Sequence, residues 1–312
     1  MADLRSTPED ACAVAEHALG RRTLAAERDR VGASNDVYFV ALADGEECVV
    51  RIGRAEWRYL VPQEVWAVGR CRALGVPAPD VLAADWSLAH FPWPYTVARR
   101  LPGRVLRRRD LTPPEIASLL EQMGGYLRLI HSVELAGHGN LIETGDSYTG
   151  RHASAWEALR DDMEHRIAHL PPGLLPDERV GRVRALVERE RDLFALDGAV
   201  LVHGDFQGNN VLVSDGRVTG VLDFENLVAG DPALDFKPVH FHSDAPTRDL
   251  AALRRGYGDR PGLFDDRFER RLLVYELVFA LELLWWKTRF GNTAGAAELV
   301  AKLDRIEEAL AE

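Results

Sequence analysis

The segment from Val202 to Asp235 constrains the fold more than any other part of this 312-residue chain. An apolar strand leads directly into His203 and Asp205. Asn210 follows five residues after Asp205, and Asp223 follows thirteen residues after Asn210, at the end of another apolar strand. An Asp-Gly turn joins the two strands between Asn210 and Asp223, which predicts an antiparallel hairpin with both residues at one end.

These spacings indicate chemistry on a phosphate group. One carboxylate and one amide oxygen at a hairpin end suit Mg²⁺, a hard ion that takes oxygen ligands and keeps positions open for phosphate and water. Asp205 lies one loop away, placed to accept a proton from an attacking hydroxyl. Metal ligands, a proton acceptor and positioning groups are the parts that phosphoryl transfer needs.

The HxDxxxxN…D pattern resembles the catalytic set of protein kinases. HGD at 203–205, DFE at 223–225 and GDPALD at 230–235 together resemble the aminoglycoside phosphotransferase family of kinase-like enzymes that act on small molecules. The resemblance implies an α+β, protein-kinase-like bilobal fold, ATP or GTP as phosphoryl donor, Mg²⁺ as cofactor and transfer to a substrate hydroxyl. A regulated protein kinase fits poorly, because the seven residues between Asp223 and Asp231 are too few for a phosphorylated activation segment.

The resemblance also implies roles for single residues of this segment. Asp205 would be the catalytic aspartate, and Asn210 and Asp223 would be the magnesium ligands. Three further residues are implied as structural supports of the catalytic loop: His203, Asp231 and Asp235.

In the N-terminal part, Gly32–Asp36 looks like the loop that covers the nucleotide phosphates, with Ser34 and Asn35 as binding residues. The purine is expected to meet the backbone of a hinge near Arg99 and Leu101.

Arg51 is a departure from the kinase pattern, which has lysine at the end of this strand. A guanidinium can hold a phosphate with two N–H groups, but it is bulkier than an ammonium and differs in geometry. Glu64 in the following helix is the expected acidic partner of Arg51, with Glu56 as the second candidate.

The pattern of secondary structure changes near residue 101. Strands are expected within 23–52, over 81–85 and over 94–98, and helices over 7–20, 62–74, 113–133, 153–169 and 177–196. A short β segment over 199–223 precedes a helical C-terminus. We therefore predict a mostly β nucleotide-binding lobe over 1–101, and a mostly α catalytic and substrate-binding lobe over 102–312.

Composition excludes several classes of protein. The net charge of −11 argues against a nucleic-acid partner. Three widely spaced cysteines without a CxxC pair argue against a disulfide framework or a thiolate zinc site. The N-terminus lacks the pattern of a secretion signal, and the most apolar region, Leu272–Trp286, is too short to span a bilayer. We expect a cytoplasmic protein without a membrane partner.

The acceptor is the open question. Aminoglycosides rank first because these polycations suit an acidic cleft, while macrolides, other antibiotics, choline, homoserine and sugars stay as alternatives. A non-catalytic kinase-like nucleotide-binding protein is a further alternative, which Arg51 keeps open. The candidate acceptor-binding residues are Glu276, Glu282 and Trp286, with Trp285 and Phe290 as other aromatics that would line a pocket only if they do not serve the core.

Overall fold

A computed structural model describes residues 6–29, 35–289 and 291–312. By its contacts the chain divides into two compact units. Unit 1 comprises residues 1–119 and 207–226, and unit 2 comprises residues 120–206 and 227–312. The lobe boundary at residue 101 remains a prediction, and the hairpin segment 207–226 belongs to the N-terminal unit by this division.

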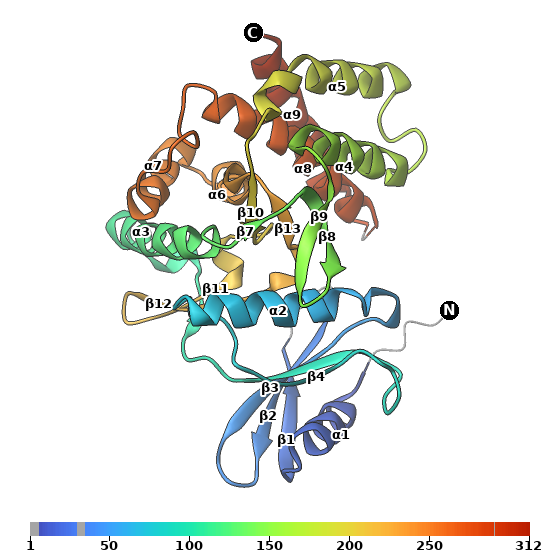
Figure 1. The fold of residues 1–312 in the computed structure, drawn as a ribbon, viewed down its shortest axis with the longest axis vertical. Helices are drawn as coiled ribbons and strands as arrows, with labels where there is room; N and C mark the ends of the chain where they lie inside the picture. Colours follow the sequence, from blue (N-terminus) through green and yellow to red (C-terminus); the bar gives the residue numbers. More distant parts are fainter. Residues whose placement is uncertain (1–5, 30–34, 290) are drawn as a thin grey trace. The chain divides into compact units, whose positions relative to one another are not determined.

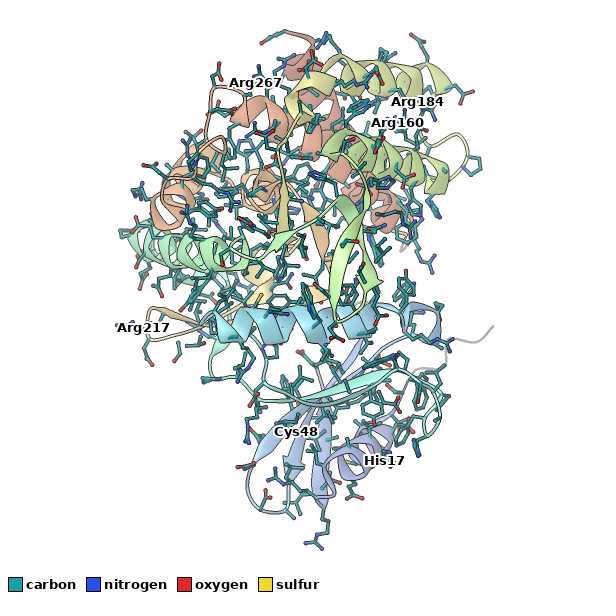
Figure 2. The ribbon with its side chains drawn as sticks, in the orientation of Figure 1. His17, Cys48, Arg160, Arg184, Arg217 and Arg267 are labelled. Carbon is teal, nitrogen blue, oxygen red and sulfur yellow. The ribbon has the colours of Figure 1, made fainter. Side chains whose placement is uncertain are left out.

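Unit 1 is built on a five-stranded antiparallel sheet in the order β1-β2-β3-β5-β4 (Figure 1). Its strands are β1 (Thr23–Arg28), β2 (Asp36–Leu42), β3 (Glu47–Ile52), β4 (Val81–Asp85) and β5 (Tyr95–Arg99). Helix α1 (Pro8–Leu19) packs its buried face on this sheet. The core between them includes Val14, Tyr38 and Val50, and the buried Cys48 lies in the same sheet (Figure 2).

Helix α1 begins and ends where its sequence predicts. The Thr7 side chain accepts a hydrogen bond from the Asp10 N–H, and the Asp10 carboxylate accepts one from the Thr7 N–H. This reciprocal cap satisfies two N–H groups that a helix start leaves without partners. Gly20 ends the helix in the left-handed conformation. The second helix, α2 (Leu60–Ala73), starts two residues earlier than expected, with Pro62 in its first turn, where proline is tolerated.

The remaining part of unit 1 is the hairpin of β11 (Val211–Ser214) and β12 (Arg217–Val221). Its strands pair antiparallel with Val211 opposite Val221, and β6 (Arg104–Val105) adds a third strand beside β11. The predicted hairpin is therefore confirmed, including its Asp-Gly turn.

Unit 2 contains a second sheet in the order β7-β10-β13-β8-β9, together with most of the helices of the chain. Its strands are β7 (Glu134–Leu135), β8 (His138–Thr144), β9 (Ser147–His152), β10 (Ala199–Val202) and β13 (Val228–Gly230). Its helices are the later part of α3 (Pro113–Ile130), α4 (Ala155–His169), α5 (Asp177–Arg189), α6 (Lys237–His242), α7 (Pro246–Tyr257), α8 (Phe268–Arg289) and α9 (Thr293–Ala311). An Arg184–Glu164 ion pair of 2.6 Å links α5 to α4, and Figure 2 shows Arg184 and Arg160 on these two helices.

The β8–β9 hairpin was not predicted from the sequence, in which no strand was expected between residues 134 and 152 of the mostly α lobe. Its strands flank a tight turn at Gly145-Asp146, and His138 pairs with His152. Polar residues occupy much of both strands, so the apolar alternation that marks a strand is weak here. Helix α5 is also shorter than expected, because it ends at Arg189 and a separate 3₁₀ turn covers Arg191–Phe194.

Helices α3 and α7 approach each other closely at two glycines. A Cβ placed on Gly256 would lie 1.7 Å from the Glu121 carbonyl oxygen, and one on Gly124 would lie 2.1 Å from the Leu253 carbonyl oxygen. Backbone atoms cannot rotate away as a side-chain end can. The crossing therefore requires glycine at both positions.

Gly256→Ala should lower the free energy of unfolding by about 3 kcal/mol, because the added methyl group forces the two helices apart. Gly181→Ala is the matched control, since a Cβ on this helical glycine of α5 meets nothing within 4 Å. The control should raise stability by roughly 0.5–1 kcal/mol through the higher helix propensity of alanine. Chemical denaturation of both variants measures the difference, and equal stabilities would contradict the close crossing.

Candidate active site

The loop of unit 2 that contains His203 and Gly204 is held by the side chain of Asp235. The Asp235 carboxylate accepts hydrogen bonds from the backbone N–H of His203 at 2.8 Å and of Gly204 at 2.7 Å. Gly204 has a φ of +84°, which a residue with a side chain would adopt only under strain. The loop after β10 is therefore fixed immediately before Asp205, whose side chain is only partly buried.

Asp235 is fully buried, and its own partners keep it in place. His131 Nε2 lies 2.9 Å from the carboxylate, and the other ring nitrogen lies 3.1 Å from the Tyr257 hydroxyl. Burial alone would raise the pKa of Asp235, but the hydrogen bond from His131 and the nearby His203 ring outweigh it and lower that pKa. A buried carboxylate that stays ionised accepts strong hydrogen bonds, which suits the supporting role expected of Asp235.

Asp231 supports the neighbouring turn. Its carboxylate accepts a hydrogen bond from the Ala233 N–H at 3.0 Å, which caps the 3₁₀ helix Pro232–Asp235. The Tyr275 hydroxyl donates to the same carboxylate at 3.1 Å, and Arg271 Nε lies 3.4 Å from it. Burial and the Asp231 charge raise the pKa of Tyr275, so this hydroxyl keeps its proton. The GDPALD segment is thus tied to α8 through Asp231.

In unit 1 the hairpin brings Asn210 and Asp223 to the same end. The Leu222 N–H donates to the Asn210 carbonyl at 2.8 Å, which extends the β11–β12 ladder by one step. Asp223, the next residue, has a φ of +66°, a conformation uncommon for residues other than glycine. Strain of this kind is concentrated at functional sites. The Asp223 side chain is about one-third exposed, at 36%.

Arg51 on β3 is surrounded by three carboxylates of unit 1. Its Nη1 donates to Glu64 on α2, and its Nη2 lies 3.2 Å from Asp223 and 3.5 Å from Glu225. Burial opposes the charge on Arg51, but Glu64, Asp223 and Glu225 together outweigh it and raise the pKa of Arg51. The expected Arg51–Glu64 pair is present, and the second candidate, Glu56, is exposed.

Glu225 is a member of this cluster that the sequence did not single out. Burial raises its pKa to about 7, the charges of Asp223 and Glu64 act in the same direction, and Arg51 and the Asn35 hydrogen bond oppose them. The Asn35 side-chain amide donates to Glu225 at 2.7 Å, which joins two residues 190 positions apart in the chain. The signal that could have pointed to it was the DFE triplet, in which glutamate stands where protein kinases have glycine.

The other nucleotide-binding candidates have different surroundings. Ser34 lies outside the described residues. Arg99 is half-exposed and pairs with Asp80 at 3.1 Å and Glu46 at 3.5 Å. Leu101 is partly buried and packs close to Gly220 of the hairpin.

The acceptor candidates all lie on α8 in unit 2. Glu276 is buried and hydrogen-bonded to His240 Nδ1 at 2.6 Å. Glu282 is partly exposed and pairs with Arg166 of α4 at 2.6 Å. Trp286 is partly buried and contacts Trp285 edge to face, with ring centroids 4.8 Å apart. Phe290 lies outside the described residues. The acceptor-binding roles of these residues remain predictions.

The donor set at the hairpin end fits a magnesium ion. Asn210 and Asp223 offer an amide oxygen and a carboxylate, the hard ligands that Mg²⁺ prefers when phosphates and water complete its shell. Among the described residues, no group of three or more His, Cys, Asp or Glu side chains is arranged to hold a metal ion. Asn210 and Asp223 would leave the other positions of such an ion open to phosphate oxygens and water.

No helix in the described part of the chain combines the length and the apolar character needed to cross a membrane.

A family model described as the phosphotransferase enzyme family matches residues 25–273 of this chain. The chain belongs to this phosphotransferase enzyme family. The match covers both the Arg51–Glu64 pair and the whole segment from Val202 to Asp235. The HGD, DFE and GDPALD motifs therefore identified the family correctly, and the chain is a small-molecule phosphotransferase.

Two similar proteins show what this phosphotransferase resembles. Viomycin phosphotransferase of Streptomyces vinaceus is 28% identical over 242 residues, which are 72% of this chain and 75% of the relative. Hygromycin-B 4-O-kinase of Escherichia coli is 25% identical over 236 residues, which are 74% of this chain and 66% of the relative.

A solved structure extends the likeness of the fold over 96% of the chain. The crystal structure of a thermostable mutant of aminoglycoside phosphotransferase APH(4)-Ia, in ternary complex with AMP-PNP and hygromycin B, covers 96% of this phosphotransferase and 98% of that chain. The TM-score is 0.72 at 18% identity. The expected α+β, protein-kinase-like fold is confirmed.

Proposed function

We propose that this phosphotransferase moves the γ-phosphate of ATP or GTP, with Mg²⁺ as cofactor, to a hydroxyl group of an aminoglycoside-type antibiotic. One observation carries the proposal: the Asp235 carboxylate holds the backbone of His203 and Gly204 just before Asp205, and the chain then continues into the hairpin that brings Asn210 and Asp223 to one end. The first element supplies a proton acceptor, and the second supplies oxygen ligands for a metal–nucleotide complex.

In the proposed reaction the acceptor hydroxyl attacks the γ-phosphorus in line. The new O–P bond forms while the bond to the β-phosphate oxygen breaks, and ADP or GDP leaves. Asp205 orients the hydroxyl and takes its proton. Asn210 and Asp223 would hold Mg²⁺, which neutralises charge that develops on the phosphate oxygens. Arg51 would bind the nucleotide phosphates, and His203, Asp231 and Asp235 would keep the loop in place.

The acceptor class is supported by the relatives and by charge. The names of two relatives designate viomycin and hygromycin B, and a net charge of −11 favours a cationic acceptor over an anionic one. Glu276, Glu282 and Trp286 remain the proposed acceptor-binding residues, with nucleotide binding assigned to residues 1–101 and acceptor binding to residues 102–312. We place the reaction in the cytoplasm, where the nucleotide donor is available.

Asp223→Ala should weaken binding of the Mg²⁺–nucleotide complex by about tenfold or more, because it removes a charged metal ligand. Binding of the nucleotide without Mg²⁺ should change much less. Calorimetric titration with AMP-PNP, with and without Mg²⁺, separates the two effects. An unchanged affinity in the presence of Mg²⁺ would remove Asp223 from the metal site.

The proposal is tested by measuring ADP and GDP release with Mg²⁺ across a panel of acceptors. The panel contains aminoglycosides, viomycin, a macrolide, choline, homoserine and a sugar. Turnover with aminoglycosides supports the proposed acceptor class. Turnover with another acceptor keeps the chemistry and overturns the acceptor, and nucleotide binding without turnover on any acceptor would favour a non-catalytic nucleotide-binding protein.

A further inference from the structure

We infer that Glu225 is a positioning residue that makes this phosphotransferase depend on arginine at position 51 and that connects the nucleotide-covering loop to the metal-binding hairpin. The inference rests on the proposed function in one respect, since it assumes that Arg51 and Asp223 serve a bound Mg²⁺–nucleotide complex.

The geometry of the Arg51 cluster supports the first part of the inference, which is the dependence on arginine at position 51. The guanidinium uses its two terminal nitrogens in different directions, Nη1 toward Glu64 and Nη2 toward both Asp223 and Glu225. An arginine has five N–H donors in a fixed planar fork, whereas a lysine carries its charge on a single nitrogen. The fork therefore lets Nη1 serve Glu64 while Nη2, a separate nitrogen, serves Asp223 and Glu225.

Charge explains why Glu225 is the residue that creates this demand. In the lysine-type arrangement of kinases the cation pairs with one acid, at the place of Glu64, and the acid at the place of Asp223 holds Mg²⁺. Glu225 adds a third carboxylate to the cluster, and its side chain is only 19% exposed. A point charge placed near Glu64 would leave Asp223 and Glu225 as neighbouring carboxylates without a shared cation, and their repulsion would disturb the position of the metal ligand.

The contacts of Asn35 support the second part of the inference, which is the connection between the nucleotide-covering loop and the hairpin. Its amide nitrogen donates to Glu225, and a Cβ on Gly53 would lie only 3.2 Å from its amide oxygen, so Asn35 fits between the end of β3 and Glu225. Asn35, Gly53, Glu64 and Glu225 also line the same small hollow in unit 1. Asn35 is the last residue before β2, at the end of the loop expected to cover the phosphates. Glu225 therefore contacts both that loop residue and the cation beside the metal ligand.

A double-mutant cycle tests the inference. The proteins are wild type, Arg51→Lys, Glu225→Gln and the Arg51→Lys/Glu225→Gln double variant, with Glu56→Gln as the control for loss of an exposed carboxylate of the same unit. We expect Arg51→Lys to weaken Mg²⁺–AMP-PNP binding about tenfold or more, and Glu225→Gln to weaken it only about threefold. The double variant should bind about five times more tightly than Arg51→Lys alone. Glu56→Gln should bind like wild type.

Steady-state kinetics and an Asn35 variant distinguish a positioning role of Glu225 from a purely structural one. The variants should raise KM for the nucleotide and leave KM for the acceptor unchanged. Asn35→Ala should raise KM for the nucleotide in the wild-type background and have little further effect in the Glu225→Gln background. Independent, additive effects of Arg51→Lys and Glu225→Gln overturn the inference, as does an equal rise of both KM values.

The cycle also distinguishes this inference from the proposed function. Nucleotide binding does not depend on the acceptor, so rescue by Glu225→Gln in a protein that phosphorylates none of the tested acceptors would uphold the inference and contradict the proposed function. Thermal unfolding of the same four proteins without nucleotide gives a second readout. There too Glu225→Gln should restore part of the stability that Arg51→Lys removes, and the absence of rescue in both readouts overturns the inference.

Discussion

Asp205→Asn should lower kcat by about 10³-fold, because the amide keeps the shape of the carboxylate but cannot take the proton of the attacking hydroxyl. The dissociation constant for the Mg²⁺–nucleotide complex should change by less than about threefold, since the proposed metal ligands are Asn210 and Asp223. Pre-steady-state measurement of phosphoryl transfer, with calorimetry for the nucleotide, measures both quantities.

Asp215→Asn is the matched control for this prediction. Asp215 lies ten residues further along the chain, is exposed, and occupies the β11–β12 turn with a φ of +50°, a conformation that asparagine also adopts readily. The kcat of Asp215→Asn should equal that of wild type. A rate of Asp205→Asn within about tenfold of this control would show that another group accepts the proton.

Asp235→Asn should both destabilise the protein and slow the reaction. The amide group of asparagine cannot accept from both the His203 and Gly204 N–H groups in the way the carboxylate does, so at least one buried donor loses its partner. Each such loss costs about 1–3 kcal/mol, and the hydrogen bond from His131 no longer has an ionised acceptor. We expect the free energy of unfolding to fall by about 3 kcal/mol, and kcat of the folded protein to fall because the backbone before Asp205 is released.

Asp266→Asn gives the comparison, because Asp266 is exposed in the same unit. Urea denaturation followed by assay well below the unfolding transition separates stability from rate. If Asp235→Asn had the stability of Asp266→Asn, the buried carboxylate would not be holding the loop. If Asp235→Asn lost stability but kept a wild-type kcat, Asp235 would support only the fold and not the reaction.

The residues with the most constrained spacing were the easiest to place from the sequence. Asn210 and Asp223 flank two short strands and an Asp-Gly turn, so the antiparallel register alone brings them to one end of the hairpin. The expected contact between Arg51 and Glu64 joins residues thirteen positions apart on consecutive elements. Such local geometry follows from strand and helix periodicity.

Other features depend on contacts that periodicity does not encode. The β8–β9 hairpin has many polar positions, so periodicity alone does not reveal its strands. They become evident from the pairing of β8 with β13 in the sheet. The close approach of Gly124 and Gly256 requires knowing that α3 and α7 meet. Glu225 gains its partners Asn35 and Arg51 from distant parts of the chain, so its place in the cluster could not be derived from the DFE triplet alone.

The most direct test of the account is mass spectrometry of hygromycin B and viomycin after incubation with ATP, Mg²⁺ and either wild type or Asp205→Asn. The account predicts that wild type adds one phosphoryl group to a hydroxyl of at least one of these antibiotics, with one ADP released for each group transferred. Asp205→Asn should leave the antibiotic unmodified while still binding the nucleotide. Unmodified antibiotic with wild type despite tight Mg²⁺–nucleotide binding would contradict the proposed acceptor, and equal modification by both proteins would contradict the role of Asp205.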